Sequence, residues 1–211
     1  MAGLVLCGGA SRRMGAEKAL LAFEGEALVA RVARRLSSVA SPVILAPGTR
    51  GRLGDLGFEE VDDVAEGSGP LAGLAAGLSV SPHPLVAVVA VDMPFASPEV
   101  LTLLARRIGT ADAAIPVTDE GSQPLHAVYS TRALPAIRHA LRSGRRAVRE
   151  VVSDVLRARW VERDAWRTGD PTGTFAMNLN RPEDWTSMEA LGTEASVRTA
   201  IDEKEERDER R

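Results

Sequence analysis

A glycine- and arginine-rich stretch near the N-terminus carries the residue types that bind a phosphate chain. Residues 8–15 read Gly-Gly-Ala-Ser-Arg-Arg-Met-Gly, and Lys18 follows closely. Gly8 and Gly9 have no Cβ, so their backbone N–H groups can approach phosphate oxygens. Three positive side chains, suited to the dense charge of a triphosphate, stand within this stretch: Arg12, Arg13 and Lys18. The pattern therefore predicts a nucleoside triphosphate as the ligand.

The stretch differs from the two common glycine-rich nucleotide motifs. In a Walker loop a Lys directly follows the last Gly, whereas here Gly15 is followed by Ala16. The dinucleotide fingerprint G-x-G-x-x-G does not fit Gly8-Gly9 either. The competing interpretation is a glycine-rich turn with surface arginines.

A carboxylate directly follows the most apolar segment of the chain. Residues 85–91 are apolar at every position, which is typical of a central strand buried on both faces, and Asp92 comes next. If this strand adjoins the first one, Asp92 lies beside the glycine-rich stretch. Mg²⁺ typically takes one or two carboxylates together with phosphate oxygens and water. Asp92 is therefore the candidate metal ligand, and its alternative role is to cap a turn before Met93-Pro94.

Other polar residues give weaker signals. Asp62 and Asp63 precede the glycine-rich residues 67–73, and an acid there can accept hydrogen bonds from guanine or ribose. These acids equally fit ordinary loop positions. The three histidines, His83, His126 and His139, lack the spacing of metal ligands, and only His126 is considered as a residue that could line a pocket. Cys7 has no base nearby in the sequence and is interpreted as a small apolar residue.

Short aliphatic runs alternate with helical stretches along the chain, which predicts an α/β sheet covered on both faces. The expected strands are residues 3–7, 42–46, 57–61, 85–91, 113–117, 124–129 and 159–161, with 124–129 a candidate antiparallel strand. The expected helices are residues 27–39, 71–78, 131–142 and 147–156, one opening at Ser97-Pro98-Glu99 and one at Asn180.

Length and charge limit the classes of protein. The 211 residues fit one domain, expected over residues 1–192, followed by a charged, solvated tail over residues 193–211 with five basic and seven acidic residues. The net charge of −3 is not that of a nucleic-acid-binding protein. No apolar run approaches the length of a membrane helix. The single Cys7 and the lack of a basic leader predict a cytoplasmic protein.

Five segments together resemble the molybdenum cofactor guanylyltransferases, the MobA family of the nucleotidyltransferase superfamily. The first segment, residues 6–21, closely resembles the signature loop of this family, and by itself this loop marks the wider superfamily. The other four follow in the family's order and make the resemblance more specific: residues 69–73, 92–94, 124–129 and 178–184. The resemblance spans Leu4 to Trp185.

The resemblance implies a Rossmann-like three-layer nucleotidyltransferase fold with a mostly parallel sheet. It implies that the terminal phosphate of molybdenum-molybdopterin attacks the α-phosphate of Mg²⁺-bound GTP, releasing diphosphate and forming the guanine dinucleotide cofactor. It also implies transient contacts with proteins that deliver or receive the cofactor. By position, the nucleotide would be held by Leu6, Cys7, Gly8, Gly9 and Asp63, its phosphates by Arg13 and Lys18, Mg²⁺ by Asp92, and the second substrate by Asn180.

Two departures from the family pattern keep alternatives open. Relatives often carry Asn where this chain has Ala46, and the family's Asn-Thr-Pro is here Asn180-Arg181-Pro182. Residues 144–146, Gly-Arg-Arg, are a basic turn that fits either the pterin phosphate or solvent. The alternatives are a molybdenum cofactor cytidylyltransferase, another small-molecule nucleotidyltransferase, and a nucleotide-binding relative without catalysis. Cytidylyltransferases resemble Ala-Ala-Gly where this chain has Cys7-Gly8-Gly9, which favours guanine.

Overall fold

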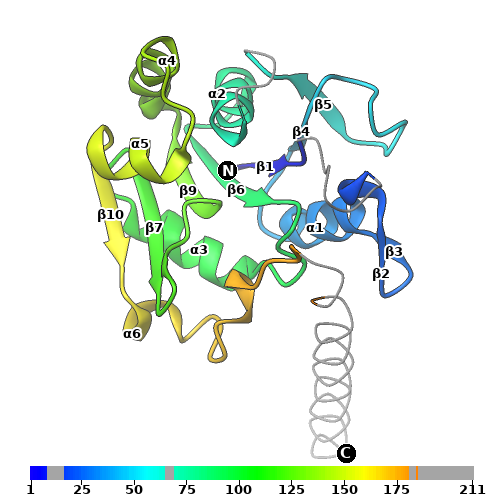
Figure 1. Ribbon diagram of the computed structural model, residues 1–211. Helices are drawn as coiled ribbons and strands as arrows, with labels where there is room; N and C mark the ends of the chain where they lie inside the picture. Colours follow the sequence, from blue (N-terminus) through cyan, green and yellow to red (C-terminus); the bar gives the residue numbers. More distant parts are fainter. Residues whose placement is uncertain (9–16, 65–68, 181–183, 185–211) are drawn as a thin grey trace, which may run out of the picture.

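The computed structural model describes residues 1–8, 17–64, 69–180 and 184, and its centre is an eight-stranded sheet (Figure 1). The strands are hydrogen-bonded in the order β10-β7-β9-β6-β1-β4-β5, and the short β8 pairs with β7. Their bounds are β1 Ala2–Leu6, β4 Val43–Gly48, β5 Glu59–Asp62, β6 Leu85–Ala90, β7 Ala113–Thr118, β8 Gly121–Ser122, β9 His126–Ser130 and β10 Ala158–Val161.

The sheet is mixed. The β1 strand runs parallel to both β4 and β6, β4 runs parallel to β5, and β10 runs parallel to β7. The β9 strand is antiparallel to β6 and to β7. The predicted antiparallel strand at residues 124–129 is thus confirmed with a later start at His126. Since β1, β4, β5 and β6 point the same way, their carboxyl ends meet at one edge of the sheet.

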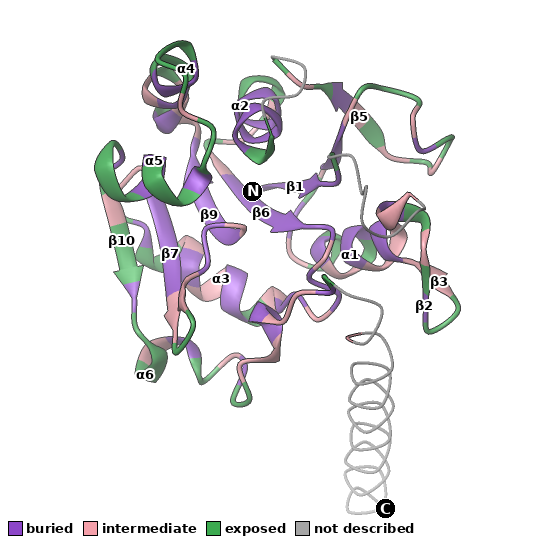
Figure 2. Ribbon diagram, viewed as in Figure 1, coloured by how far each residue is buried: buried purple, intermediate pink, exposed green. Residues whose placement is uncertain are grey.

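Helices cover both faces of the sheet (Figure 1). One face carries α1 Leu28–Ser37 and α3 Pro98–Arg107, and the short α6 Arg163–Trp166 lies at the end of β7. The other face carries α2 Pro70–Val80, α4 Leu134–Arg142 and α5 Val148–Asp154. Two separate clusters of buried apolar side chains fill the two layers between helices and sheet, and the strands between them are largely buried (Figure 2). This is the three-layer α/β arrangement predicted from the sequence.

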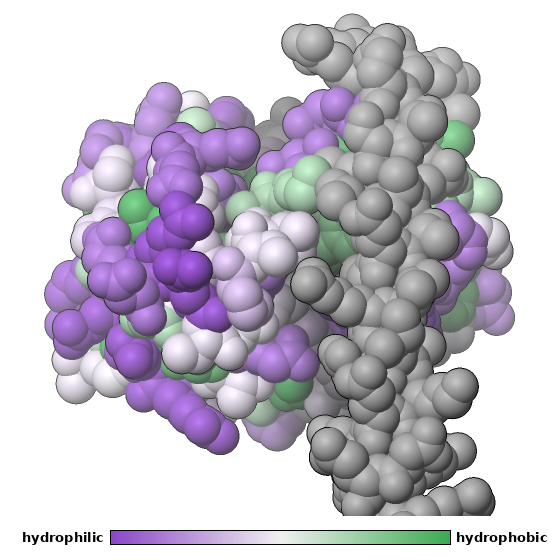
Figure 3. All heavy atoms as spheres, turned by 90° about the horizontal axis from the view of Figure 1, so that it is seen from below, coloured by the Kyte–Doolittle hydropathy of each residue, from purple (hydrophilic) through white to green (hydrophobic). Residues whose placement is uncertain are grey.

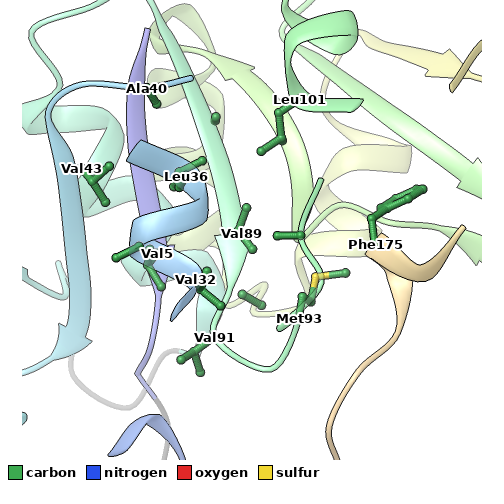
Figure 4. Close-up of a cluster of buried hydrophobic side chains, with 14 of the residues drawn as sticks. Val5, Val32, Leu36, Ala40, Val43, Val89, Val91, Met93, Leu101 and Phe175 are labelled. Atoms are coloured by element: carbon green, nitrogen blue, oxygen red, sulfur yellow. The ribbon is translucent and has the colours of Figure 1, made fainter. Parts of the chain in front are cut away.

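The central strands are apolar at every position because both of their faces are buried. In β1, Val5 faces the α1 side, whereas Leu4 packs on the α2 side. On the α1 side, Val5 and Val89 gather with Val32 of α1 and Leu101 of α3 (Figure 4). On the opposite side, a Cβ added at Gly77 would stand 2.3 Å from Leu4 Cδ2, so this glycine lets α2 approach the sheet closely.

One element of the site region was not predicted. Residues 22–27, of which only residue 27 was assigned to an element, form the hairpin of β2 Ala22–Phe23 and β3 Glu26–Ala27. The hairpin turns at Glu24 and Gly25, both with positive φ, and α1 therefore begins only at Leu28. The sequence lacked the Asn-Gly or Asp-Gly signal that marks such a turn.

The remaining predicted segments that the structure describes agree with it to within a few residues, whereas the helix predicted to open at Asn180 falls largely outside the described residues. The helix expected over residues 131–142 begins with a 3-10 turn at Thr131–Ala133, and Ser97 caps α3 by accepting a hydrogen bond from Val100 N at 3.2 Å. The tail at residues 193–211 and the boundary at 192 lie outside the described residues. None of the described helices is long and apolar enough to cross a membrane. Seen from below, the described surface is mostly hydrophilic (Figure 3).

Candidate active site

The carboxyl ends of three adjacent strands bring the predicted residues together. In the sheet, Leu6 is paired with Ala46 of β4 on one side and with Ala90 of β6 on the other. Two hydrogen bonds extend this pairing beyond the strands, from Cys7 N to Ala46 O at 3.1 Å and from Val91 N to Leu6 O at 3.0 Å. The glycine-rich stretch after β1 and the carboxylate after β6 therefore start side by side, as predicted.

Lys18, Asp92 and Asn180 meet at this edge although they are far apart in the sequence. Lys18 Nζ lies 3.2 Å from Asp92 Oδ2 and 3.3 Å from Asn180 Oδ1. Both charged side chains are mostly shielded, with exposed fractions of 16% for Lys18 and 26% for Asp92. Asn180 is brought there by the preceding residue, because Leu179 N donates to Asp92 O at 2.8 Å.

One oxygen of Asp92 is available to a ligand. Its Oδ2 accepts from Lys18, whereas its Oδ1 is buried and has no hydrogen-bond partner among the described residues. Leaving a carboxylate oxygen buried and unpaired is costly, which favours a cation or a donor at that position. No group of three or more His, Cys, Asp or Glu side chains that could hold a metal is present within residues 1–8, 17–64, 69–180 and 184. The arrangement fits an ion that takes one carboxylate and completes its shell with phosphate oxygens and water, as Mg²⁺ does.

Asp63 lies at the end of β5 in surroundings made of small residues. Its N–H donates to Gly48 O at 2.9 Å, and its Oδ1 is buried without a hydrogen-bond partner in the described chain. A Cβ added at Gly73 would lie 3.2 Å from this oxygen and 3.3 Å from the Cβ of Ala46. Burial raises the pKa of Asp63, while the nearby Arg52 opposes this shift. Asp63 is thus an acceptor with spare capacity beside the ends of β1 and β4.

Arg52 ties together the two flanks of the glycine-rich stretch. Its Nη2 donates to Cys7 O at 2.7 Å and its Nε to Pro47 O at 2.8 Å, and its Nη1 forms an ion pair with Glu17. Sequence reasoning missed Arg52, because two of its three partners are backbone carbonyls that any residue could supply. Arg52 therefore holds the flanks at residues 7 and 17 at a fixed separation.

The backbone groups expected to hold the nucleotide are not equally available. Both polar backbone groups of Cys7 already have protein partners, and Leu6 O accepts from Val91 N. Burial raises the pKa of the Cys7 thiol to about 12, which excludes a thiolate nucleophile at neutral pH. Gly8 is exposed and follows directly. The predicted Gly9 and Arg13 fall outside the described residues, as does Arg12.

Two other features singled out in the sequence, His126 and the basic turn at residues 144–146, make contacts away from this site. His126 was the histidine considered as a pocket residue, but its ring is fully buried, its Nε2 accepts from Ser97 N at 3.0 Å, and its centroid lies 4.6 Å from that of Phe175. Burial lowers its pKa to about 3, so the ring is a neutral structural acceptor. In the basic turn, Arg145 pairs with Asp154 at 2.8 Å and Arg146 donates to Leu141 O at 3.0 Å.

The sheet order and the helices on its two faces form the nucleotidyltransferase fold. A solved structure with this fold is 2-C-methyl-D-erythritol 4-phosphate cytidylyltransferase of Thermus thermophilus. It is 22% identical, with a TM-score of 0.68, over 90% of this chain and 97% of that one. Within this class, the chain belongs to the family of the MobA-like NTP transferase domain, whose family model matches residues 3–160.

Close relatives cover nearly all of the chain. The probable molybdenum cofactor guanylyltransferase of Pelotomaculum thermopropionicum is 36% identical over 86% of this chain and 88% of its own length. The protein of the same name from Methanosarcina mazei is 37% identical over 88% of each chain. Among solved structures, molybdopterin-guanine dinucleotide biosynthesis protein A of Archaeoglobus fulgidus is 28% identical. Its TM-score is 0.80 over 92% of this chain and 100% of that one.

Proposed function

We propose that this chain transfers GMP from GTP to molybdenum-molybdopterin, releasing diphosphate and forming the guanine dinucleotide cofactor. The observation that carries the proposal is the convergence of Lys18, Asp92 and Asn180 beside the glycine-rich stretch, in a chain whose relatives are named for this activity. A lysine, a carboxylate with one oxygen that has no partner in the described chain, and a neutral amide suit two phosphate-bearing substrates.

The reaction needs a nucleophile, a leaving group and neutralisation of negative charge. An anionic oxygen of the molybdopterin phosphate forms a bond to the α-phosphorus of GTP, and the bond between that phosphorus and the bridging oxygen of the β-phosphate breaks. The electron pair leaves on the diphosphate. Because the attacking phosphate is already an anion, no protein base has to remove a proton. Catalysis then depends on placing the two phosphates in line and stabilising the developing charge.

Lys18 is the residue in the described chain best placed to stabilise that charge. Its ammonium group sits between the Asp92 carboxylate and the Asn180 amide oxygen, in a partly shielded position where a charge interaction is stronger than in bulk water. Asn180, held within reach of the same ammonium, can donate its amide N–H to the acceptor phosphate. Arg13 is proposed as a second positive group on the phosphates.

Mg²⁺ is part of the proposal, with Asp92 Oδ1 as its protein ligand. When bound with the triphosphate, the ion would supply charge neutralisation at the phosphate oxygens. The support is the buried oxygen without a partner in the described chain, which is a hard donor suited to this ion.

Guanine is favoured by the acceptor at Asp63. The base presents the N1–H and N2–H₂ donors on one edge, and a carboxylate accepts from both, whereas the corresponding edge of cytosine carries the acceptors O2 and N3. Gly8 keeps the approach to the ends of β1 and β4 open, because a Cβ there would lie 3.3 Å from Gly48 N. We include Gly9, Cys7 and Leu6 in the nucleotide site by their position.

The proposal also includes the setting of the reaction. A cytoplasmic location is supported by the single, buried and free Cys7. Transient contacts with proteins that deliver or receive the cofactor would follow from a product that is needed in other enzymes.

Diphosphate release from GTP and from CTP, each with Mg²⁺ and molybdenum-molybdopterin, tests the proposal. We expect release with GTP and at least about tenfold less with CTP, which corresponds to about 1.4 kcal/mol. Release from CTP alone would support the cytidylyltransferase instead, and release from neither nucleotide would refute both.

Asp92→Asn should lower turnover at least about a hundredfold. Asp63→Asn should weaken the preference for GTP, and Asp62→Asn, at the exposed neighbour, should leave it unchanged.

A further inference from the structure

Three arginines of α1 contact the hairpin that follows Lys18, the segment that follows Asp92, or both. Arg34 donates from Nε and Nη2 to the carboxylate of Glu26 in the hairpin, at 3.2 and 2.9 Å. Arg35 donates from Nε to Ala96 O at 2.7 Å, in the segment that follows Asp92. Of the three, Arg31 contacts both segments.

The contacts of Arg31 form a bridge between the hairpin and the segment after Asp92. Its Nη1 lies 2.7 Å from Glu24 Oε2, and its Nε donates to Pro94 O at 3.1 Å. Its guanidinium carbon lies 5.1 Å from the ring centroid of Phe23 and 5.9 Å from that of Phe95. Because the Arg31 side chain is only 11% exposed, these interactions are weakly screened by solvent.

The two bridged segments are those that present the lysine and the carboxylate. The hairpin follows Lys18 after a single 3-10 turn, Lys18–Leu20, and Pro94 stands two residues after Asp92. Phe23 and Phe95 themselves touch edge to face, with centroids 5.8 Å apart. Contacts that converge on Arg31 therefore link the backbone that follows Lys18 to the backbone that follows Asp92.

The hairpin conformation also depends on this bridge. Glu24 has φ of 50°, a left-handed conformation that Gly, Asn or Asp adopts more readily than Glu. The carboxylate of the residue in this unfavourable conformation is the one that Arg31 binds. Strain of this kind persists where surrounding contacts impose it.

We propose that Arg31 is a positioning residue for the transfer reaction. It holds the Lys18 segment and the Asp92 segment at the separation that lets both side chains act on the same phosphates. The expected loss of kcat rests on the proposed function, whereas the expected effect on nucleotide binding rests on the geometry alone. Arg34 and Arg35 each hold one of the two segments and so serve as matched controls.

The first experiment compares Arg31→Met with Arg34→Met and Arg35→Met in steady-state diphosphate release from GTP. Met keeps much of the length of the side chain and removes the charge and the donors. We expect Arg31→Met to lower kcat about ten- to a hundredfold, as a misplacement of about 1 Å would, with a smaller change in the KM for GTP. Arg34→Met and Arg35→Met should each stay within about threefold of the parent enzyme. Equal losses in all three variants would overturn the proposal.

Chemical rescue separates positioning from general destabilisation. Arg31→Ala removes the guanidinium from beside two aromatic rings, and added ethylguanidinium at millimolar concentration should restore part of the lost kcat. The same additive should have no effect on Arg34→Ala. A loss of kcat in Arg31→Ala that the additive does not restore, with thermal unfolding lowered in parallel, would show a merely structural role.

A third measurement needs no acceptor and stands apart from the proposed function. GTP affinity in the presence of Mg²⁺ is measured for Lys18→Ala, Arg31→Ala and the double variant. If Arg31 acts through Lys18, the double variant should bind GTP no more weakly than Lys18→Ala alone. Additive losses would overturn the inference. Failure of the parent enzyme to use molybdenum-molybdopterin would refute the proposed function and leave this result standing.

Discussion

The buried His126 makes a specific prediction about stability and pH. Its ring is fully buried, its Nε2 accepts from Ser97 N, and its Nδ1 has no hydrogen-bond partner among the described residues. Burial lowers the pKa from 6.5 to about 3. Protonation would convert the accepting nitrogen to a donor facing the N–H of Ser97, at the start of α3. We therefore predict that His126 makes the fold sensitive to mild acid and that His126→Gln removes this sensitivity.

The magnitude follows from the difference between the two pKa values. Because the folded pKa lies below the unfolded one, the contribution to stability is fully present above pH 6.5. It is lost as pH falls from 6.5 towards 3, because the unfolded chain binds a proton that the folded chain does not. At pH 5 the loss from this one group is about 2 kcal/mol relative to pH 8. For a domain of this size, that corresponds to a Tm lower by about 4 to 8 °C.

The assay is urea or thermal unfolding of the parent chain and His126→Gln at pH 8 and pH 5. Gln keeps an acceptor near the position of Nε2 and does not titrate. The other two histidines are present in both proteins, so their effects cancel in the difference. We expect the parent chain to lose about 2 kcal/mol more than the variant between the two pH values. Identical pH dependence in both proteins would refute a neutral, buried His126. His126→Phe, which leaves Ser97 N without its acceptor, should be less stable at both pH values.

Three further predictions concern the contacts of Arg52, the packing at Gly77 and the metal ion. Arg52→Ala should weaken GTP binding about tenfold or more, because it frees the flanks of the glycine-rich stretch, whereas Arg50→Ala, 60% exposed and paired with Asp62, should not. Equal affinities in titration calorimetry for the two variants would contradict this. Gly77→Ala should destabilise the fold by about 1 to 3 kcal/mol in urea unfolding, since its Cβ would press on Leu4. Excess EDTA should abolish diphosphate release and Mg²⁺ should restore it, and release unaffected by the chelator would argue against the metal.

Most of the fold could be predicted because its central strands leave a clear signal. Residues 85–91 are apolar at every position since both faces of β6 are covered by helices, and β1 shows the same pattern. The β2–β3 hairpin could not be predicted, because its turn uses Glu24 where a left-handed residue is needed and the contact that holds it comes from α1. A contact between distant segments overrides the local preference there.

The residues of the candidate site also fall into two groups, those that could be predicted from the sequence and those that could not. Lys18 and Asp92 could be predicted to approach each other, because each follows a strand and the strands adjoin. Arg52 and Arg31 could not, because they act on backbone carbonyls and on aromatic rings that carry no pairing signal in the sequence. Residues that touch substrates thus have type and spacing as clues, whereas residues that position them become visible only when the chain is folded.

In the fold, Ala46 stands where relatives often carry Asn, close to the buried carboxylate oxygen Oδ1 of Asp63. In the sequence, Ala46 is a departure from the family pattern that keeps alternative functions open. In the fold, Ala46 and Asp63 both lie against Gly73, and the methyl group of Ala46 has no donor to offer the buried Asp63 Oδ1. Because no donor in the described chain satisfies this oxygen, its hydrogen-bonding capacity is left for a ligand. In the proposed nucleotide site, the departure would place more of the choice of base on Asp63. For this reason Asp63→Asn should affect nucleotide preference more in this chain than in a relative that keeps the Asn.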